Sequence, residues 1–164
     1  MRLVADHLRE QALARTGTDD FDEFGRSAFN RNYYATFLMI REKFYTMGVL
    51  QVGQELPHAN VPQRLRGILK KELSKARLKT HRSGDKELTG KIHSAESAAE
   101  DLARMIEEAK AIRTLADYEP ETAIVLSRRG FSLVDVDIDA AKAWPQKAAG
   151  YLRVIESAWR QINV

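Results

Sequence analysis

The chain has 164 residues, of which 44% are hydrophobic and 30% are charged, and its formal net charge is +3. This balance is typical of a globular protein rather than a disordered chain, and we expect a single domain over residues 1–164 with a sizeable core. No apolar run approaches the roughly 20 residues that a membrane-spanning helix needs. Because cysteine is absent, disulfides and thiolate metal sites are excluded, which fits a cytoplasmic location without a membrane anchor.

Apolar residues recur at steps of three and four along most of the chain, which predicts helices. The first is expected from about Leu3 to Leu13. The second and longest should begin near residue 20 and reach Met47, and its many apolar side chains place it in the middle of a bundle. A third helix lies within residues 58–79, and a fourth covers about 92–113.

The C-terminal part of the chain combines a different pattern with a last helix. Residues 121–136 hold two short β-prone runs around a tip of Ser127 to Gly130, which predicts a small hairpin or an ordered loop. A helix from about Asp137 to Ile162 follows, and Pro145 inside it predicts a kink or a split. The sequence therefore predicts an all-α fold, an antiparallel bundle of about five helices with a short β-hairpin or loop near 121–136.

Positive charge is concentrated in one segment of the chain. Residues 62–91 carry 10 basic and 3 acidic side chains, a net charge of +7, whereas residues 1–25 and 92–164 each carry −3. A polyanion should be drawn to this segment first, although a solvated helix face would give the same pattern. The candidates for contact with RNA phosphates are Arg64, Lys70, Lys71, Lys75 and Arg77. Arg128 and Arg129, at the predicted loop tip, are further candidates for contact with RNA or a partner.

The second helix carries an unusual group of polar residues in its apolar part, the stretch "NRNYYATF" at residues 30–37. This stretch resembles the motif helix of the HEPN domain family, whose members often read Ser-Arg-Ala-Tyr-Tyr-Ala-Ala-Phe. The stretch "IRTLADYEP" at 112–120 resembles the Arg-x-x-Ala-Asp-Tyr junction of that family, and "LPHAN" at 56–60 stands where many members carry a histidine. The Ala-rich final helix is also similar, so the resemblance covers most of the chain.

The resemblance implies a helical domain that dimerises through its motif helix, here residues 20–47, and forms a composite, metal-independent ribonuclease site. In active members an arginine and a polar residue are followed, after four to six residues, by a histidine. The arginine would stabilise the charge developing on the scissile phosphate, and the histidine would transfer the proton of the ribose 2′-hydroxyl. Many members act in bacterial toxin–antitoxin or antiphage modules, which makes a protein from the same operon a possible partner.

Arg31 and Asn32 match the opening of this motif, but the histidine is missing. The positions where it would stand hold Thr36, Phe37 and Leu38, none of which can exchange a proton near pH 7. His58 is the best substitute, because the third helix should start near the end of the second. The candidate catalytic set is therefore Arg31, Asn32 and His58.

Structural roles compete with these functional ones. Arg31 could instead be a buried arginine paired with a carboxylate such as Asp117, since an unpaired buried charge costs several kcal/mol. Arg113 and Asp117 are one helical turn apart and can pair along the helix, and with Tyr118 they are expected to fix the end of that helix. No metal-ligand pattern and no cofactor-binding motif occurs, so we expect no metal and no cofactor.

Three functions follow from these observations. The first is a HEPN-like homodimer of a defence or toxin–antitoxin module that binds RNA or a partner protein, with a degenerate ribonuclease motif. The second is an active metal-independent endoribonuclease that uses Arg31, Asn32 and a histidine outside the motif. The third is a non-catalytic scaffold or adaptor.

Overall fold

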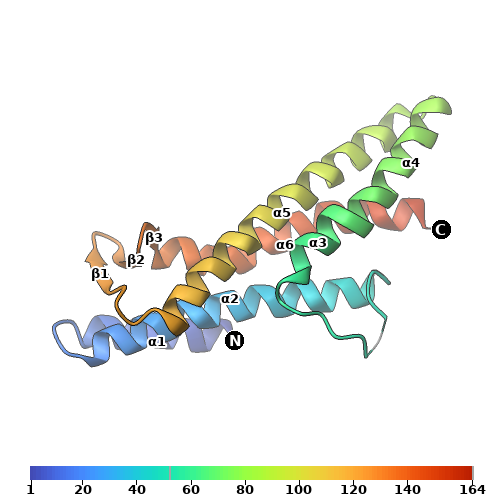
Figure 1. The fold of residues 1–164 in the computed structure, drawn as a ribbon. Coiled ribbons are helices and arrows are strands. Elements are labelled where there is room, and N and C mark those ends of the chain that lie inside the picture. The colour runs from blue at the N-terminus through green and yellow to red at the C-terminus, as the bar shows by residue number, and fades with distance from the viewer. Residues whose placement is uncertain (52, 164) are drawn as a thin grey trace. The chain divides into compact units, whose positions relative to one another are not determined.

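The computed structural model describes residues 1–51 and 53–163, and they form the all-α fold that the sequence predicts, with one small sheet. None of the helices in these ranges combines the length and the apolarity needed to cross a bilayer. The elements in chain order (Figure 1) are α1 (Arg2–Ala14), α2 (Asp20–Thr46), α3 (Asn60–Arg64), a π-helical segment η1 (Leu65–Leu69), α4 (Lys70–Arg82), α5 (Lys86–Tyr118), β1 (Ile124–Ser127), β2 (Gly130–Leu133), β3 (Val136–Asp137) and α6 (Ile138–Ile162). Because α3, η1 and α4 follow one another directly, the described residues form five helical stretches.

The chain divides into two compact units. Unit 1 consists of residues 1–38 and 108–146, and unit 2 consists of residues 39–107 and 147–164. The long helices α2, α5 and α6 each contribute residues to both units. Each unit is described separately below.

In unit 1 the sheet packs on the first half of α2 through aromatic side chains. The ring of Phe131 on β2 meets Phe21 and Phe29 edge-on, with centroid distances of 5.8 and 5.9 Å. Gly25 lies on the same face of α2, and a Cβ atom built there would stand 3.1 Å from Ile124 and 3.4 Å from Phe131. The glycine therefore permits the close approach of helix and sheet.

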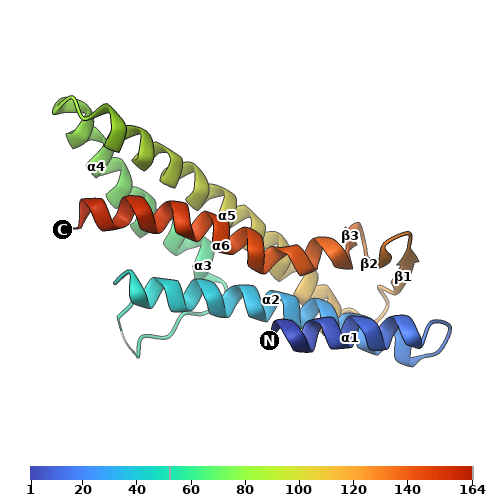
Figure 2. The same ribbon diagram turned by 180° about the vertical axis from the view of Figure 1, so that it is seen from behind.

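The predicted hairpin at 121–136 is confirmed, with a third strand added. β1 pairs antiparallel with β2, ending at the pair Ser127 and Gly130, and β2 pairs antiparallel with β3. Gly130 has a φ of +131°, a conformation that favours glycine. Figure 2 shows that the strands follow the end of α5 and lead into α6.

In unit 2, α4 and α5 form an antiparallel helical hairpin with a very short connection (Figure 1). Gly84, in the turn that follows α4, has a φ of +78°, and the backbone N–H groups of Gly84 and Asp85 donate to the carbonyls of His81 and Thr80. This pair of bonds is the Schellman motif. The Asp85 carboxylate then accepts the N–H of Leu88 at 3.0 Å and caps α5, so one residue closes one helix and opens the next.

The π-helical segment adjusts the buried face of the stretch 60–82. Its fully buried residues, Val61, Leu65, Leu69 and Leu73, are each four positions apart. In a helix of 3.6 residues per turn, side chains four positions apart differ in direction by about 40° around the helix axis, so the buried face would drift around the helix with each step. A wider i→i+5 turn compensates for part of the drift, and Ile68 within it is left half exposed.

Of the two outcomes predicted at Pro145, a kink or a split, the split is wrong, because α6 is continuous from Ile138 to Ile162. A proline removes one intrahelical hydrogen bond, but it does not by itself end a helix whose apolar side is buried on both sides of it. Trp144, Ala148, Leu152 and Ile155 are all buried, and their burial compensates for the lost bond.

Candidate functional site

In unit 1, Arg26 holds the end of α5 against α2. Its Nη1 and Nη2 atoms donate to five backbone carbonyls, those of Leu115, Ala116, Glu119, Pro120 and Thr122, at 2.6–3.4 Å. The carbonyls of Leu115 and Glu119 also accept backbone N–H groups, whereas no backbone donor is described for the other three, so Arg26 supplies it. The positive charge of Arg26 also opposes the negative end of the helix dipole. Its Nε donates to Asp22, whose other carboxylate oxygen accepts the N–H of Ile124 at 2.9 Å.

A second set of contacts links the stretch 30–37 on α2 to the stretch 112–120 on α5. The amide of Asn30 donates to Asp117 at 2.6 Å, and Arg113 donates to the hydroxyl of Tyr34 at 3.2 Å. Arg113 also pairs with Asp117 at 2.7 Å, and its guanidinium lies over the rings of Tyr34 and Tyr118, 5.6 and 5.5 Å from the centroids. The two polar stretches, about eighty residues apart in sequence, therefore meet in one network.

Charge in this network is balanced. Burial disfavours the charged form of Arg113, but the Asp117 carboxylate and the hydroxyl of Tyr34 outweigh it, so the pKa of Arg113 is raised. The neighbouring Tyr33 is almost fully buried, and this burial raises its pKa to about 12. Both groups therefore keep their neutral-pH charge state over a wide range, and neither is suited to proton transfer near pH 7.

Beside this network lies an open cleft of about 300 Å³. Its lining comes from the first half of α2 and the end of α5, namely Glu23, Arg26, Ser27, Asn30, Arg31, Ala116 and Asp117. Arg31 is exposed, and it forms no ion pair or hydrogen bond with the residues that the structure describes. The alternative of a buried Arg31 paired with Asp117 is therefore wrong, because Asp117 is occupied by Asn30 and Arg113.

Asn32, the second residue of the predicted motif, points away from the cleft. It is only 4% exposed, and its amide donates to the carbonyl of Ala28 at 3.1 Å. Thr36 is fully buried and donates to the carbonyl of Asn32 at 2.9 Å. The polar residues inside α2 are thus satisfied by their own helix, and Arg31 is separated from Asn32 because adjacent residues of a helix face different directions.

No histidine lines the cleft in the described part of the chain. His58 is half buried just before α3 and belongs to unit 2, whereas Arg31 and Asn32 belong to unit 1. The structure therefore places the three residues of the predicted catalytic set in two units, and only Arg31 at the cleft. Among the described residues, no group of three or more His, Asp or Glu side chains is arranged to hold a metal ion.

Three cations of the basic segment, Arg66, Lys70 and Arg77, pair with carboxylates of α5. Arg66 pairs with both Glu100 and Glu107 at 2.8 and 2.5 Å, and Lys70 pairs with Glu100 at 3.1 Å. Arg66, followed by Lys70, lowers the pKa of Glu100. Within α4 and α5, Lys75 pairs with Glu72 at 2.7 Å and Arg77 pairs with Glu96 at 2.9 Å.

The remaining predicted RNA-binding residues have no such partner among the residues that the structure describes. Arg64 is half buried and Lys71 is exposed on the stretch 60–82. Arg128 and Arg129 are exposed at the turn between β1 and β2, where the N–H of Arg129 donates to Ser127 at 3.3 Å.

Four residues of the cleft, Glu23, Arg26, Ser27 and Asn30, were not predicted as site residues. A signal for them exists in the sequence, because positions 23, 27, 30 and 31 are separated by steps of three and four and form a polar stripe beside the apolar one. The role of Arg26 has no such signal, because its partners lie 89–96 residues further along the chain.

Comparison of the chain with protein-family models, with curated protein sequences and with solved structures found no match.

Proposed function

We propose that this protein is a HEPN-like RNA-binding homodimer of a bacterial defence or toxin–antitoxin module, with a degenerate ribonuclease motif. The observation that carries the proposal is the exposed Arg31 on the rim of an open cleft, next to the network that joins the two stretches resembling the family. Every other cation of this network has a structural partner: Arg26 pairs with Asp22, and Arg113 pairs with Asp117.

An exposed arginine beside a cleft has the geometry for binding a phosphate, because its planar guanidinium presents paired donors that match phosphate oxygens. In a twofold dimer formed through α2, the interface presents the same patch twice, so that Arg31 of one copy would lie near Arg31 of the other. Two like charges repel each other unless an anion lies between them. A phosphodiester of RNA between the two arginines would relieve this repulsion and join the two copies.

Binding without cleavage is expected from the same residues. Cleavage by the ribose 2′-hydroxyl requires a group that accepts a proton and another that protonates the leaving oxygen. The motif positions 36 and 37 are buried, position 38 is leucine, and the cleft is lined by no imidazole among the described residues. The arginine that binds phosphate is thus present without the histidine that would complete the chemistry.

The test is to incubate the purified protein with single-stranded RNA in EDTA and to measure binding and cleavage together. We expect a saturable shift in fluorescence anisotropy, a dimer in sedimentation equilibrium, and no new 2′,3′-cyclic phosphate ends. Such ends, if they vanish in Arg31→Ala, would establish the endoribonuclease instead. A dimer that neither binds nor cleaves RNA would leave a scaffold that binds a protein partner.

A further inference from the structure

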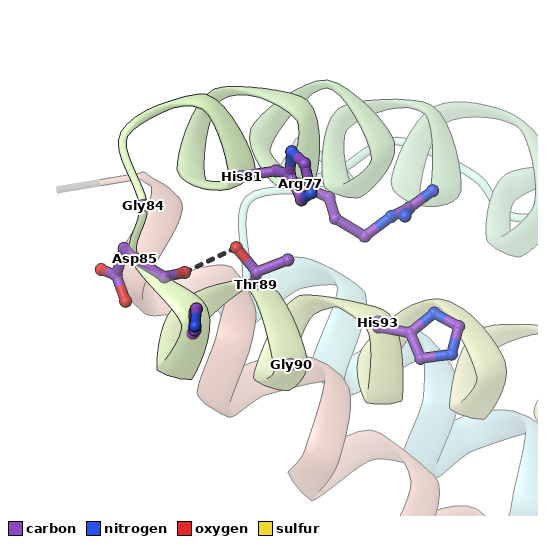
Figure 3. A pocket seen from close by; sticks show the side chains of 8 residues that line it. Arg77, His81, Gly84, Asp85, Thr89, Gly90 and His93 are labelled. Atoms are coloured by element: carbon purple, nitrogen blue, oxygen red, sulfur yellow. Dashed lines mark hydrogen bonds between the residues drawn. The ribbon is translucent and has the colours of Figure 1, made fainter.

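A second cavity lies in unit 2, between α4 and α5 at the end where the two helices are joined. Its volume is about 490 Å³, within the range of small-molecule sites. Four of its lining side chains can carry positive charge, Arg77, His81, Lys86 and His93. Figure 3 shows Arg77 and His81 on one helix and His93 on the other, with Gly84 and Asp85 at the turn that joins the two helices.

The frame of this pocket is fixed by hydrogen bonds. The Schellman motif at Gly84 and the cap at Asp85 hold the turn, and the hydroxyl of Thr89 donates to Thr80 at 2.9 Å and to the Asp85 carbonyl at 2.6 Å. The pocket therefore exists before any ligand binds, which lowers the entropy cost of binding.

Arg77 is held in position by a nearly buried carboxylate. The Glu96 side chain is 10% exposed, accepts the Ser74 hydroxyl, and pairs with the Nε atom of Arg77 at 2.9 Å. The two terminal nitrogens of Arg77 have no hydrogen-bond partner among the described residues. The Nε atom of Arg77 makes no aligned hydrogen bond within the described residues, so Glu96 holds the guanidinium by charge alone. Its two terminal nitrogens are suited to a two-point contact with an anion.

The positive charge of Lys86 is at an electrostatically unfavourable position in its own helix, α5. Lys86 is the first residue of α5, at the positive end of the helix dipole, and it is exposed without an ion pair among the described residues. The only carboxylate that lines the pocket, Asp85, already accepts the N–H of Leu88. A ligand anion would be stabilised both by Lys86 and by the helix end.

We propose that this pocket binds the phosphate group of a nucleotide-sized ligand, with Arg77 and Lys86 as its main contacts and the two histidines at its sides. Space for the rest of the ligand lies over Gly90, where an added Cβ atom would meet nothing within 4 Å. The site uses no residue of the cleft at Arg31 and lies in the other unit, so it goes beyond the proposed function. A free mononucleotide and a phosphodiester of RNA both carry such a phosphate, and the experiment below distinguishes the two.

The experiment is a titration of the ¹⁵N-labelled full chain, followed by two-dimensional NMR, with three probes: inorganic phosphate, adenosine 5′-monophosphate and a short single-stranded oligoribonucleotide. We expect saturable shifts confined to residues 77–93 for inorganic phosphate and the monophosphate, and saturable shifts of the same residues, beside those of the cleft at Arg31, for the oligoribonucleotide. A free-nucleotide site gives the tightest binding to the monophosphate, and an RNA site gives the tightest binding to the oligomer. Shifts that are spread over the surface or that do not saturate would overturn the proposal.

Variants separate this site from general attraction of anions. Lys86→Glu should weaken phosphate binding about tenfold or more, the effect of losing one charged hydrogen bond. Because the substitution places an acidic residue at a helix N-terminus, it should not destabilise the fold. Lys147→Glu makes the same charge change on α6, away from the pocket, and should leave phosphate affinity unchanged. Equal effects of the two variants would overturn the proposal.

The histidines have a separate readout. If their side chains lie beside the bound phosphate, the His81→Gln/His93→Gln double variant should bind phosphate more weakly than the wild type, and equal affinity would remove the histidines from the site. The other charged groups near them are Arg77 on α4, Asp85 in the turn, and Lys86 and Glu96 on α5. RNA binding at Arg31 can fail without affecting these results, because inorganic phosphate and the monophosphate test the pocket alone.

Discussion

Asp22 and Arg26, one turn apart on α2, both form hydrogen bonds with the backbone that leads from the end of α5 to β1. Asp22 accepts the N–H of Ile124 at 2.9 Å, and Arg26 donates to carbonyls from Leu115 to Thr122. The pair thereby fixes the path of the chain from the end of α5 to the first strand. The cleft at Arg31 lies beside this junction and depends on its geometry.

Replacing Arg26 should destabilise the protein strongly. Arg26→Ala removes the described donor to the carbonyls of Ala116, Pro120 and Thr122, and we expect a loss of about 2–4 kcal/mol in the free energy of unfolding. Arg26→Lys should recover only part of this loss, because an ammonium cannot reproduce the planar fork of donors. Urea unfolding measures both, with the exposed Arg31→Ala as control, expected within about 0.5 kcal/mol of the wild type. Equal stability of Arg26→Ala and Arg31→Ala would contradict this role.

Two glycines inside helices should respond to alanine with opposite signs. At Gly25 the new methyl group meets Ile124 at 3.1 Å, and the overpacking should exceed the roughly 1 kcal/mol that alanine gains in helix propensity. At Gly90 an added Cβ meets open space, so Gly90→Ala should stabilise by about 0.5–1 kcal/mol. Thermal unfolding of the two variants compares them directly, and changes of the same sign would show that the sheet does not pack closely on α2.

Stability should fall in acid through carboxylates that are paired in the folded state. The hydrogen bond from Lys43 lowers the pKa of Glu156 below its ordinary 4.5, and Arg66 does the same for Glu100. A lowered folded-state pKa contributes stability above about pH 4.5 that is lost as the pH falls through the folded-state value. Urea unfolding between pH 3 and pH 7 should therefore show a shallower decline for Glu156→Gln than for the wild type. Identical declines would mean that the Lys43 pair is not formed in solution.

Stability should also fall in strong alkali, because of Tyr33. Burial raises its pKa from 10.0 to about 12 in the folded state, so the folded protein resists its ionisation. The stabilisation is complete below pH 10 and is lost as the pH rises towards 12. Absorbance at the tyrosinate wavelength should reveal one late-titrating tyrosine that is missing in Tyr33→Phe. A wild-type titration in which every tyrosine ionises near pH 10 would contradict the burial of Tyr33.

The sequence predicted the fold well because helical periodicity is a local property. The long helices and the hairpin around Ser127 to Gly130 follow from the spacing of apolar residues and from turn residues close in sequence. Pro145 does not split α6, because apolar side chains on both sides of it are buried and stabilise the helix across the missing hydrogen bond.

The site was harder to predict because its contacts are distant in sequence. The net charge of residues 62–91 suggested a free basic surface, but Glu100 and Glu107, which pair with Arg66, lie outside that segment. Arg31 and Asn32 looked equivalent in the motif, yet one is exposed and the other buried, since neighbouring residues face different sides of a helix. Local patterns thus indicated which residues are polar, but not which of them are already satisfied by partners.

The affinity of single-stranded RNA for Arg31→Ala, measured by fluorescence anisotropy over a range of salt concentrations, tests the central claim most directly. The control is Arg153→Ala, which removes an exposed arginine of α6 that does not line the cleft. If Arg31 of both copies binds phosphate, the variant should bind at least tenfold more weakly, and its plot of log affinity against log salt should be shallower by about 1.4, or 0.7 for each lost contact. Equal affinities and equal slopes for the wild type and both variants would contradict the account.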